Sequence, residues 1–190
     1  MRIGVFGGSF NPPHKMHKNI ALNLVKNNYI DKVVYVPTGN KYEKKNLIDA
    51  KYRYNMLKLM IKDYDYLELS NYEIQSTLIN TYQTLDYFKK LYPNEEIYFI
   101  CGIDNLKELT TWENYEYILD NYKIIVIERD NEDVDGVLRS INSRNIINAI
   151  IDLDNISSTY IRSNINNEGV ILGKLDCDVL DYIRYNNLYQ

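Results

Sequence analysis

Long apolar runs and cysteines are both scarce in this chain of 190 residues. No apolar stretch approaches the roughly 18 residues that a membrane-spanning helix needs, so we expect no membrane partner. No charged-then-apolar leader is recognised at the start. Two cysteines, Cys101 and Cys177, are too few for a disulfide framework, and Cys101 ends an apolar run typical of a core. We therefore expect a cytoplasmic protein.

The chain also lacks a large excess of charge of either sign. The net charge is −4, with 45% hydrophobic and 25% charged residues, which is ordinary for a soluble globular protein. Such a balance gives no support for a surface that coats nucleic acid. The length predicts one domain spanning residues 1–190, and a homo-oligomer stays an alternative to a monomer.

What the chain does have is a concentrated pattern in its first 17 residues. Ile3, Val5 and Phe6 predict a buried strand that Gly7 and Gly8 end, and the Asn11–Pro12–Pro13 turn follows. A helical period begins after it, and Asn11 is a candidate cap. The apolar positions of this period are Met16, Ile20, Ala21, Leu24 and Val25. A strand, a glycine turn and a helix start form a backbone that can approach phosphate closely.

Both histidines of the chain, His14 and His17, lie at this helix start. Because they are three residues apart, they can face the same side of the helix. We interpret them as a phosphate-handling pair. The alternative is a polar helix cap next to a surface imidazole.

Strand and helix patterns alternate along the rest of the chain. Strands are predicted at 31–36, 66–69, 97–101, 123–128 and 145–152, and helices at 49–62, 79–91, from 156 on and at 176–189. The acidic segment 130–135 is predicted to be a solvated turn. This order indicates an α/β fold: a doubly wound, mainly parallel sheet in three layers, with C-terminal helices from about 157 packing on it. The first and fourth strands would bring their carboxyl ends together.

Three further groups of residues lie where such a sheet binds ligands, and each has a plainer alternative. Gly39, Lys41, Lys44 and Lys45 follow the second strand and can reach phosphate, or form a solvated linker. Gly102 and Asp104 follow the fourth strand, and Trp112 beyond them is a ligand platform or a core anchor. Ser158 and Arg162 start a late helix, which is either an anion site or an ordinary capped helix.

The stretch Gly7–His17 resembles the GGxFDPxHxGH motif of the HxGH nucleotidylyltransferases, a Rossmann-like superfamily. Asn11 stands at the usual Asp, and Met16 at the usual Gly. Four later segments are similar to motifs of one branch, the nicotinate-nucleotide adenylyltransferases, in the right order over nearly the whole length. They are 80–84, 98–104 (YFIIGxD in the family), 109–115 with the tryptophan, and 156–162 (ISSTxIR in the family).

The resemblance implies a reaction in NAD biosynthesis: AMP passes from ATP to nicotinate mononucleotide, giving the adenine dinucleotide and pyrophosphate without a covalent intermediate. It implies Mg²⁺ as the partner of ATP, with no protein metal ligands. His17 and His14 would be catalytic. The ATP site would comprise these two with Gly7, Gly8, Ser9, Phe10, Gly102, Asp104, Ser158, Thr159 and Arg162. The acceptor site would comprise Thr84, Trp112, Lys41, Lys44 and Arg129.

Two other functions stay open on sequence grounds. One is a sister adenylyltransferase that acts on pantetheine phosphate or a flavin mononucleotide, which Trp112 disfavours. The other is a non-catalytic nucleotide-binding paralogue, in which Met16 and Asn11 mark lost chemistry. In either case the partners are small molecules.

Overall fold

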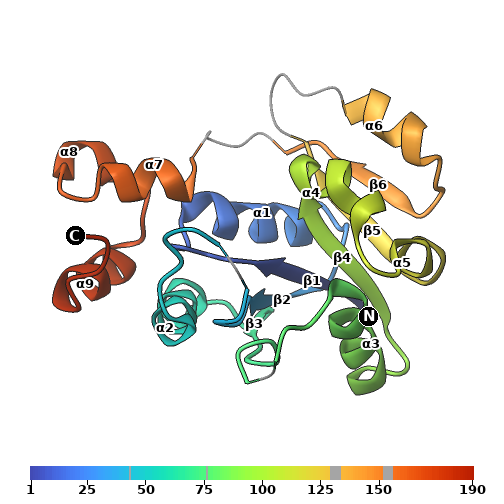
Figure 1. Cartoon of the computed structure of the whole chain (residues 1–190), viewed down its shortest axis with the longest axis horizontal. Coiled ribbons are helices and arrows are strands. Elements are labelled where there is room, and N and C mark those ends of the chain that lie inside the picture. Colours follow the sequence, from blue (N-terminus) through green and yellow to red (C-terminus); the bar gives the residue numbers. More distant parts are fainter. Residues whose placement is uncertain (43, 76, 129–133, 152–155) are drawn as a thin grey trace.

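A six-stranded sheet with every strand parallel forms the centre of the molecule (Figure 1). The computed structural model describes residues 1–42, 44–75, 77–128, 134–151 and 156–190. The strand order is β3-β2-β1-β4-β5-β6, the doubly wound arrangement expected from the sequence. The strands are β1 Arg2–Gly8, β2 Lys32–Pro37, β3 Leu67–Leu69, β4 Glu96–Gly102, β5 Lys123–Ile127 and β6 Ile146–Ala149.

Helices cover both faces of the sheet and complete the three predicted layers (Figure 1). One face packs against α1 Lys15–Lys26 and α2 Ala50–Ile61. The helices α7 Ser158–Ser163, α8 Glu168–Ile171 and α9 Cys177–Tyr185 belong to the core on this face but lie to the side of the sheet, where α9 contacts α2 (Figure 1). The other face packs against α3 Thr81–Leu91, α4 Ile103–Glu108, α5 Tyr115–Asn121 and α6 Val134–Ile141, with a 3-10 turn at Leu109–Thr111. None of the helices in these described ranges is long and apolar enough to cross a membrane.

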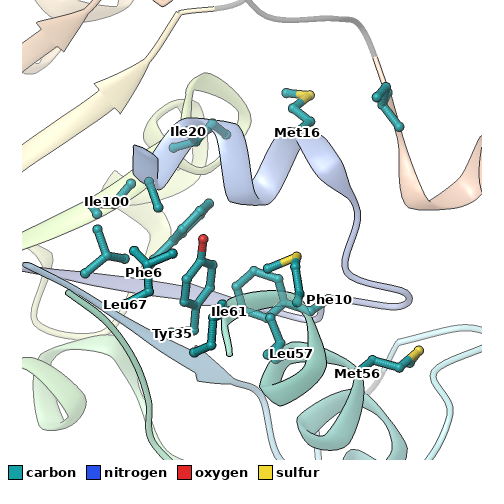
Figure 2. Packing of buried hydrophobic residues seen from close by; sticks show 14 of the residues in the cluster. Phe6, Phe10, Met16, Ile20, Tyr35, Met56, Leu57, Ile61, Leu67 and Ile100 are labelled. Atoms are coloured by element: carbon teal, nitrogen blue, oxygen red, sulfur yellow. The ribbon is translucent and has the colours of Figure 1, made fainter. Parts of the chain in front are cut away.

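The alternation of side chains along each strand explains the two cores. Val5 and Val34 point to the α3–α6 side, whereas their neighbours Phe6 and Tyr35 point to the α1–α2 side. All four are buried, because parallel strands between two helix layers have no solvated face. Figure 2 shows Phe6 and Tyr35 next to residues of α2 such as Leu57, beneath the start of α1.

The structure corrects several helix boundaries. His14, not Asn11, is the N-cap of α1. Ser157, not Ser158, caps α7, with its Oγ accepting from the amide of Tyr160 at 3.1 Å. The helix α9 ends at Tyr185, four residues earlier than predicted. At α1 and α7 the side chain that faces the free amides is one or more residues away from the position that spacing favours.

The sequence analysis also missed four helices. The helix α6 begins at Val134, so the prediction of a solvated turn is wrong for residues 134 and 135, while 130–133 lie outside the described residues. The short helices α4, α5 and α8 were not predicted because each is only one or two turns long and shows little periodicity.

The register places the candidate site. The strand β1 lies between β2 and β4. The chain continues from β2 into α2 on one face of the sheet, and from β4 into α4 on the other face. The carboxyl ends of β1 and β4 therefore meet at the switch point of the sheet, as predicted. Gly7 and Gly8 end one of these strands, and Gly102 ends the other.

Candidate active site

Two stacked imidazoles stand at the start of α1. The ring centroids of His14 and His17 lie 3.8 Å apart with 29° between the planes. The two residues also form a reciprocal capping box, in which Nδ1 of His17 accepts from the backbone amide of His14 at 3.2 Å. The prediction that both face the same side is therefore confirmed. The cap alternative is also correct for His14, which is the N-cap of α1.

The environment of His17 holds its ring rigidly. Its imidazole meets the ring of Phe10 edge-on with centroids 5.0 Å apart, and its carbonyl accepts from the hydroxyl of Tyr35 at 2.9 Å. His14 is buried and His17 is half-buried. An imidazole held by aromatic neighbours loses little conformational entropy when it binds a phosphate.

The helix α7 meets the same turn from 150 residues further along the chain. Ser158 Oγ donates to the carbonyl of Pro12 at 2.9 Å. Arg162 donates from Nη1 to the carbonyl of Asn11 at 2.6 Å, and from Nη2 to Thr159 Oγ1 at 3.1 Å. The structure thus brings the ISSTxIR segment next to the histidine turn. A hydroxyl, a guanidinium and two imidazoles gather there, which suits a polyphosphate.

The lysine-containing loop contributes one of its two candidates. Lys44 Nζ donates to Ser9 Oγ at 3.1 Å, which places its charge beside the glycine turn. Lys41 is exposed. Gly39 fixes the path of this loop, because a Cβ at that position would lie 2.4 Å from the carbonyl oxygen of Glu73.

Arg53 is a buried residue of this region whose role the sequence analysis missed. Its side chain is fully buried, and desolvation lowers its pKa to about 10. The guanidinium donates to the carbonyls of Ser9 at 2.8 Å, Thr38 at 2.6 Å and Ile48 at 2.9 Å. It therefore joins the glycine turn, the end of β2 and the start of α2. The signal available in the sequence was an arginine on the apolar face of a helix, three residues before Met56.

The candidate acceptor side lies across β4. Trp112 is half-buried: it touches Phe99 edge-on with centroids 6.0 Å apart and packs against the core on the α3 side. Asn80 Nδ2 donates to Glu113 Oε2 at 2.6 Å, which ties the start of α3 to the tryptophan loop. Gly102 caps α4, and Asp104 in its first turn is exposed. Arg129 lies outside the described residues.

Thr84 is more enclosed than an open ligand contact. It is 3% exposed, and its Oγ1 donates to Glu73 Oε1 at 2.7 Å. Burial raises the pKa of the Glu73 carboxyl to about 7, and the hydrogen bond from Thr84 offsets part of that rise. Thr81, one turn earlier on α3, is only partly buried. The sequence spacing did not distinguish the two threonines.

Both departures from the HxGH motif are buried. Met16 is 2% exposed and belongs to the core cluster on the α1 side. Figure 2 shows its side chain leaving α1 on the side away from Phe6 and Tyr35. Asn11 is also 2% exposed.

The Cys101 side chain lies in the opposite core, where burial raises the pKa of its thiol to about 12, so it is an unreactive packing residue.

Comparison with known proteins agrees with this geometry. Residues 5–164 match the model of the cytidylyltransferase-like family. A "Probable nicotinate-nucleotide adenylyltransferase" of Acholeplasma laidlawii is 37% identical, with 98% of this chain and 96% of the relative covered. One of Clostridium acetobutylicum is 36% identical, with 97% of each covered.

Solved structures give the same result. The nicotinic acid mononucleotide adenylyltransferase of Plasmodium falciparum complexed with NaAD superposes with a TM-score of 0.84. It is 26% identical, and the match covers 99% of this chain and 97% of that one. The same protein complexed with APC gives a TM-score of 0.82, with 96% of its chain covered.

Proposed function

The chain belongs to the nicotinate-nucleotide adenylyltransferase family, and from that premise we propose how its residues carry out the reaction. The enzyme transfers the AMP group of ATP to nicotinate mononucleotide, in NAD biosynthesis. An oxygen of the mononucleotide phosphate attacks the α-phosphorus in line, and the bond to the departing pyrophosphate breaks. The acceptor oxygen is already anionic near pH 7, so the step needs neither an enzyme nucleophile nor a strong base.

Catalysis then depends on positioning and charge. Oriented reactants can lower the barrier by about 7–11 kcal/mol. Donors aimed at developing charge add roughly 3–4 kcal/mol each. His17 is the half-buried imidazole beside Phe10, and we assign it to the α-phosphate. His14, stacked on it, faces the β and γ phosphates.

The helix α7 completes the triphosphate site in this proposal. Ser158, the Thr159 amide and Arg162 hold the departing pyrophosphate. The single observation that carries the assignment is that Ser158 and Arg162 both bond to the turn that leads into His14. Gly7, Gly8 and the residues after them supply backbone around the nucleotide.

The acceptor binds on the Trp112 side of the switch point. The indole offers an aromatic face to the electron-poor pyridine ring, with the accessible start of α3 opposite. Lys44, already beside Ser9, is the lysine best placed to meet the acceptor phosphate. Lys41 and Arg129 stay expectations from the sequence.

Mg²⁺ enters as the partner of ATP. Within the described ranges no group of three or more His, Cys, Asp or Glu side chains gathers to hold a metal ion. Mg²⁺ commonly binds through phosphate oxygens and water, and we propose that arrangement here. The ion would neutralise charge on the triphosphate, while the imidazoles and Arg162 orient it.

One incubation tests the proposal. The protein is mixed with ATP, Mg²⁺ and, separately, nicotinate mononucleotide, nicotinamide mononucleotide, pantetheine phosphate or flavin mononucleotide, and the products are identified by mass. We expect nicotinate adenine dinucleotide and pyrophosphate in equal amounts. Product from pantetheine phosphate or the flavin alone would reassign the acceptor. ATP binding without any product would identify a non-catalytic paralogue.

A further inference from the structure

Asn11 joins three segments that are far apart in the sequence. Its Nδ2 donates to the carbonyl of Asn46 at 2.7 Å, in the loop that carries Lys44. Its backbone carbonyl accepts from Arg162 at 2.6 Å. Its Oδ1 accepts from the hydroxyl of Tyr189 at 2.9 Å. The side-chain amide is used as donor and acceptor at once, so its orientation is fixed.

Tyr189 reaches Asn11 through an unusual backbone path. After α9 the chain turns at Asn187 and Tyr189, both in the left-handed region with φ of 50° and 66°. A tyrosine in that region is uncommon and costs about 1 kcal/mol or more, so the surrounding contacts must hold it. Leu188 between them is buried in the core, and its amide bonds back to Ile183. Figure 1 shows α9 beside α2, on the same side as α7.

The Tyr189 hydroxyl remains a donor because burial disfavours the phenolate, although two guanidinium groups lie nearby. Burial raises the pKa of the phenol, and the guanidinium charges of Arg53 and Arg162 oppose that rise without overcoming it. In the described part of the chain, neither arginine pairs with a carboxylate. The hydroxyl and the Asn11 amide are neutral, so they fix geometry without cancelling positive charge.

We propose that Tyr189 is a positioning residue for the triphosphate: through Asn11 it holds the carbonyl on which Arg162 is anchored. The inference rests on the proposed function of Arg162, and it goes beyond it by giving the segment after α9 a part in ATP binding. Without the Tyr189 hydroxyl, Asn11 Oδ1 keeps only the long contact of 3.5 Å from the Ile48 amide. The Asn11 amide would then be held mainly by its bond to Asn46, and the turn that carries the acceptor of Arg162 would be less firmly oriented.

The test compares Tyr189→Phe with Tyr185→Phe. Both remove one phenol hydroxyl near the end of α9, but Tyr185 is 87% exposed and serves as the matched control. ATP affinity is measured by calorimetry with Mg²⁺ and no acceptor, so that no turnover occurs. We expect Tyr189→Phe to weaken ATP binding about 3–10-fold, the value of one neutral hydrogen bond. The KM of the acceptor should change less than twofold, and Tyr185→Phe should behave as wild type.

A double mutant separates positioning of Arg162 from a general loss of stability. In Arg162→Ala, which has already lost the guanidinium, adding Tyr189→Phe should not weaken ATP binding further. Equal losses in both backgrounds, or unchanged ATP affinity in Tyr189→Phe, would overturn the inference. Neither result would touch the proposed function, which depends on the identity of the wild-type product.

Discussion

Nδ1 of His17 accepts the backbone amide of His14, and the two rings stack at 3.8 Å. The hydrogen bond uses one nitrogen of His17 within the helix cap. In the mechanism proposed above, Nε2 is the nitrogen of His17 that meets the phosphate. The contact that starts α1 thus also orients the imidazole of His17.

Replacement of His17 should separate its capping role from its catalytic role. His17→Ala removes both, and we expect turnover to fall about 10²–10³-fold, as for the loss of one transition-state donor. It should also destabilise the fold by about 1 kcal/mol through the lost cap. His17→Gln keeps an acceptor for the His14 amide, as in the usual capping box. His17→Gln should therefore be as stable as the wild type in urea unfolding, while its turnover, measured by pyrophosphate release, should stay as low as that of His17→Ala. Wild-type turnover in His17→Ala would refute the assigned role.

The sequence predicted those parts of the site that follow from local rules. A short apolar run ended by Gly7 and Gly8 indicates a strand leading into a turn, and the period from Met16 onward indicates a helix. The parallel order then placed the ends of β1 and β4 together. Local rules sufficed because each of these features is decided by neighbours in the chain.

Other parts depend on contacts that no spacing encodes. Arg53 falls on the apolar face of α2, and only tertiary structure supplies the three carbonyls that permit a guanidinium to be buried there. Asn11 was expected to cap α1, yet its amide binds Asn46 and Tyr189 instead. A polar side chain can satisfy itself locally or across the fold, and the sequence does not show which option has the better geometry.

The buried Arg53 should be a large contributor to stability. Arg53→Met would leave the carbonyls of Ser9, Thr38 and Ile48 without their donor, at a cost of about 3 kcal/mol or more. Arg139→Met on the exposed side of α6 is the matched control and should cost less than about 0.5 kcal/mol. Denaturant unfolding measures both. Equal, small losses in the two variants would contradict the structural role of Arg53.

Glu73 should make stability depend on pH. Its pKa is about 7 in the folded protein, against 4.5 for the free group, because burial disfavours the carboxylate. Between these values the folded state binds a proton that the unfolded state has released. The free energy of unfolding therefore falls as pH rises from about 4.5 to 7, by at most about 3 kcal/mol. Glu73→Gln should remove this slope and be the more stable form above pH 7. The free energy of unfolding in urea is measured from pH 5 to 8. As a control, Glu108→Gln at an exposed position should keep the wild-type dependence on pH. If Glu73→Gln also keeps that dependence, the assignment to Glu73 is wrong.

Trp112 should act on the acceptor and not on ATP. Loss of one base-aromatic stack costs about 1–3 kcal/mol, so Trp112→Ala should raise the KM of nicotinate mononucleotide about 10–100-fold. The KM of ATP should stay within twofold. Trp112→Phe keeps an aromatic face and should lose much less. If Trp112→Ala instead lowers stability through the lost contact with Phe99 and leaves acceptor affinity intact, the indole is a core anchor.

Met16 tests whether the altered motif has lost its chemistry. A decayed site, in which the side chain crowds the nucleotide, should gain turnover when Met16→Gly restores the usual residue. The structure predicts the opposite, because the side chain is 2% exposed and packs in the core cluster of α1. Its removal should cost about 2–5 kcal/mol for the cavity and about 1 kcal/mol for glycine in a helix.

Met16→Leu conserves the volume and should cost less than about 1.5 kcal/mol. Turnover per folded molecule, measured at a temperature where each variant is native, should be unchanged in Met16→Leu and not raised in Met16→Gly. A manyfold gain in the glycine variant would mean that the methionine obstructs ATP.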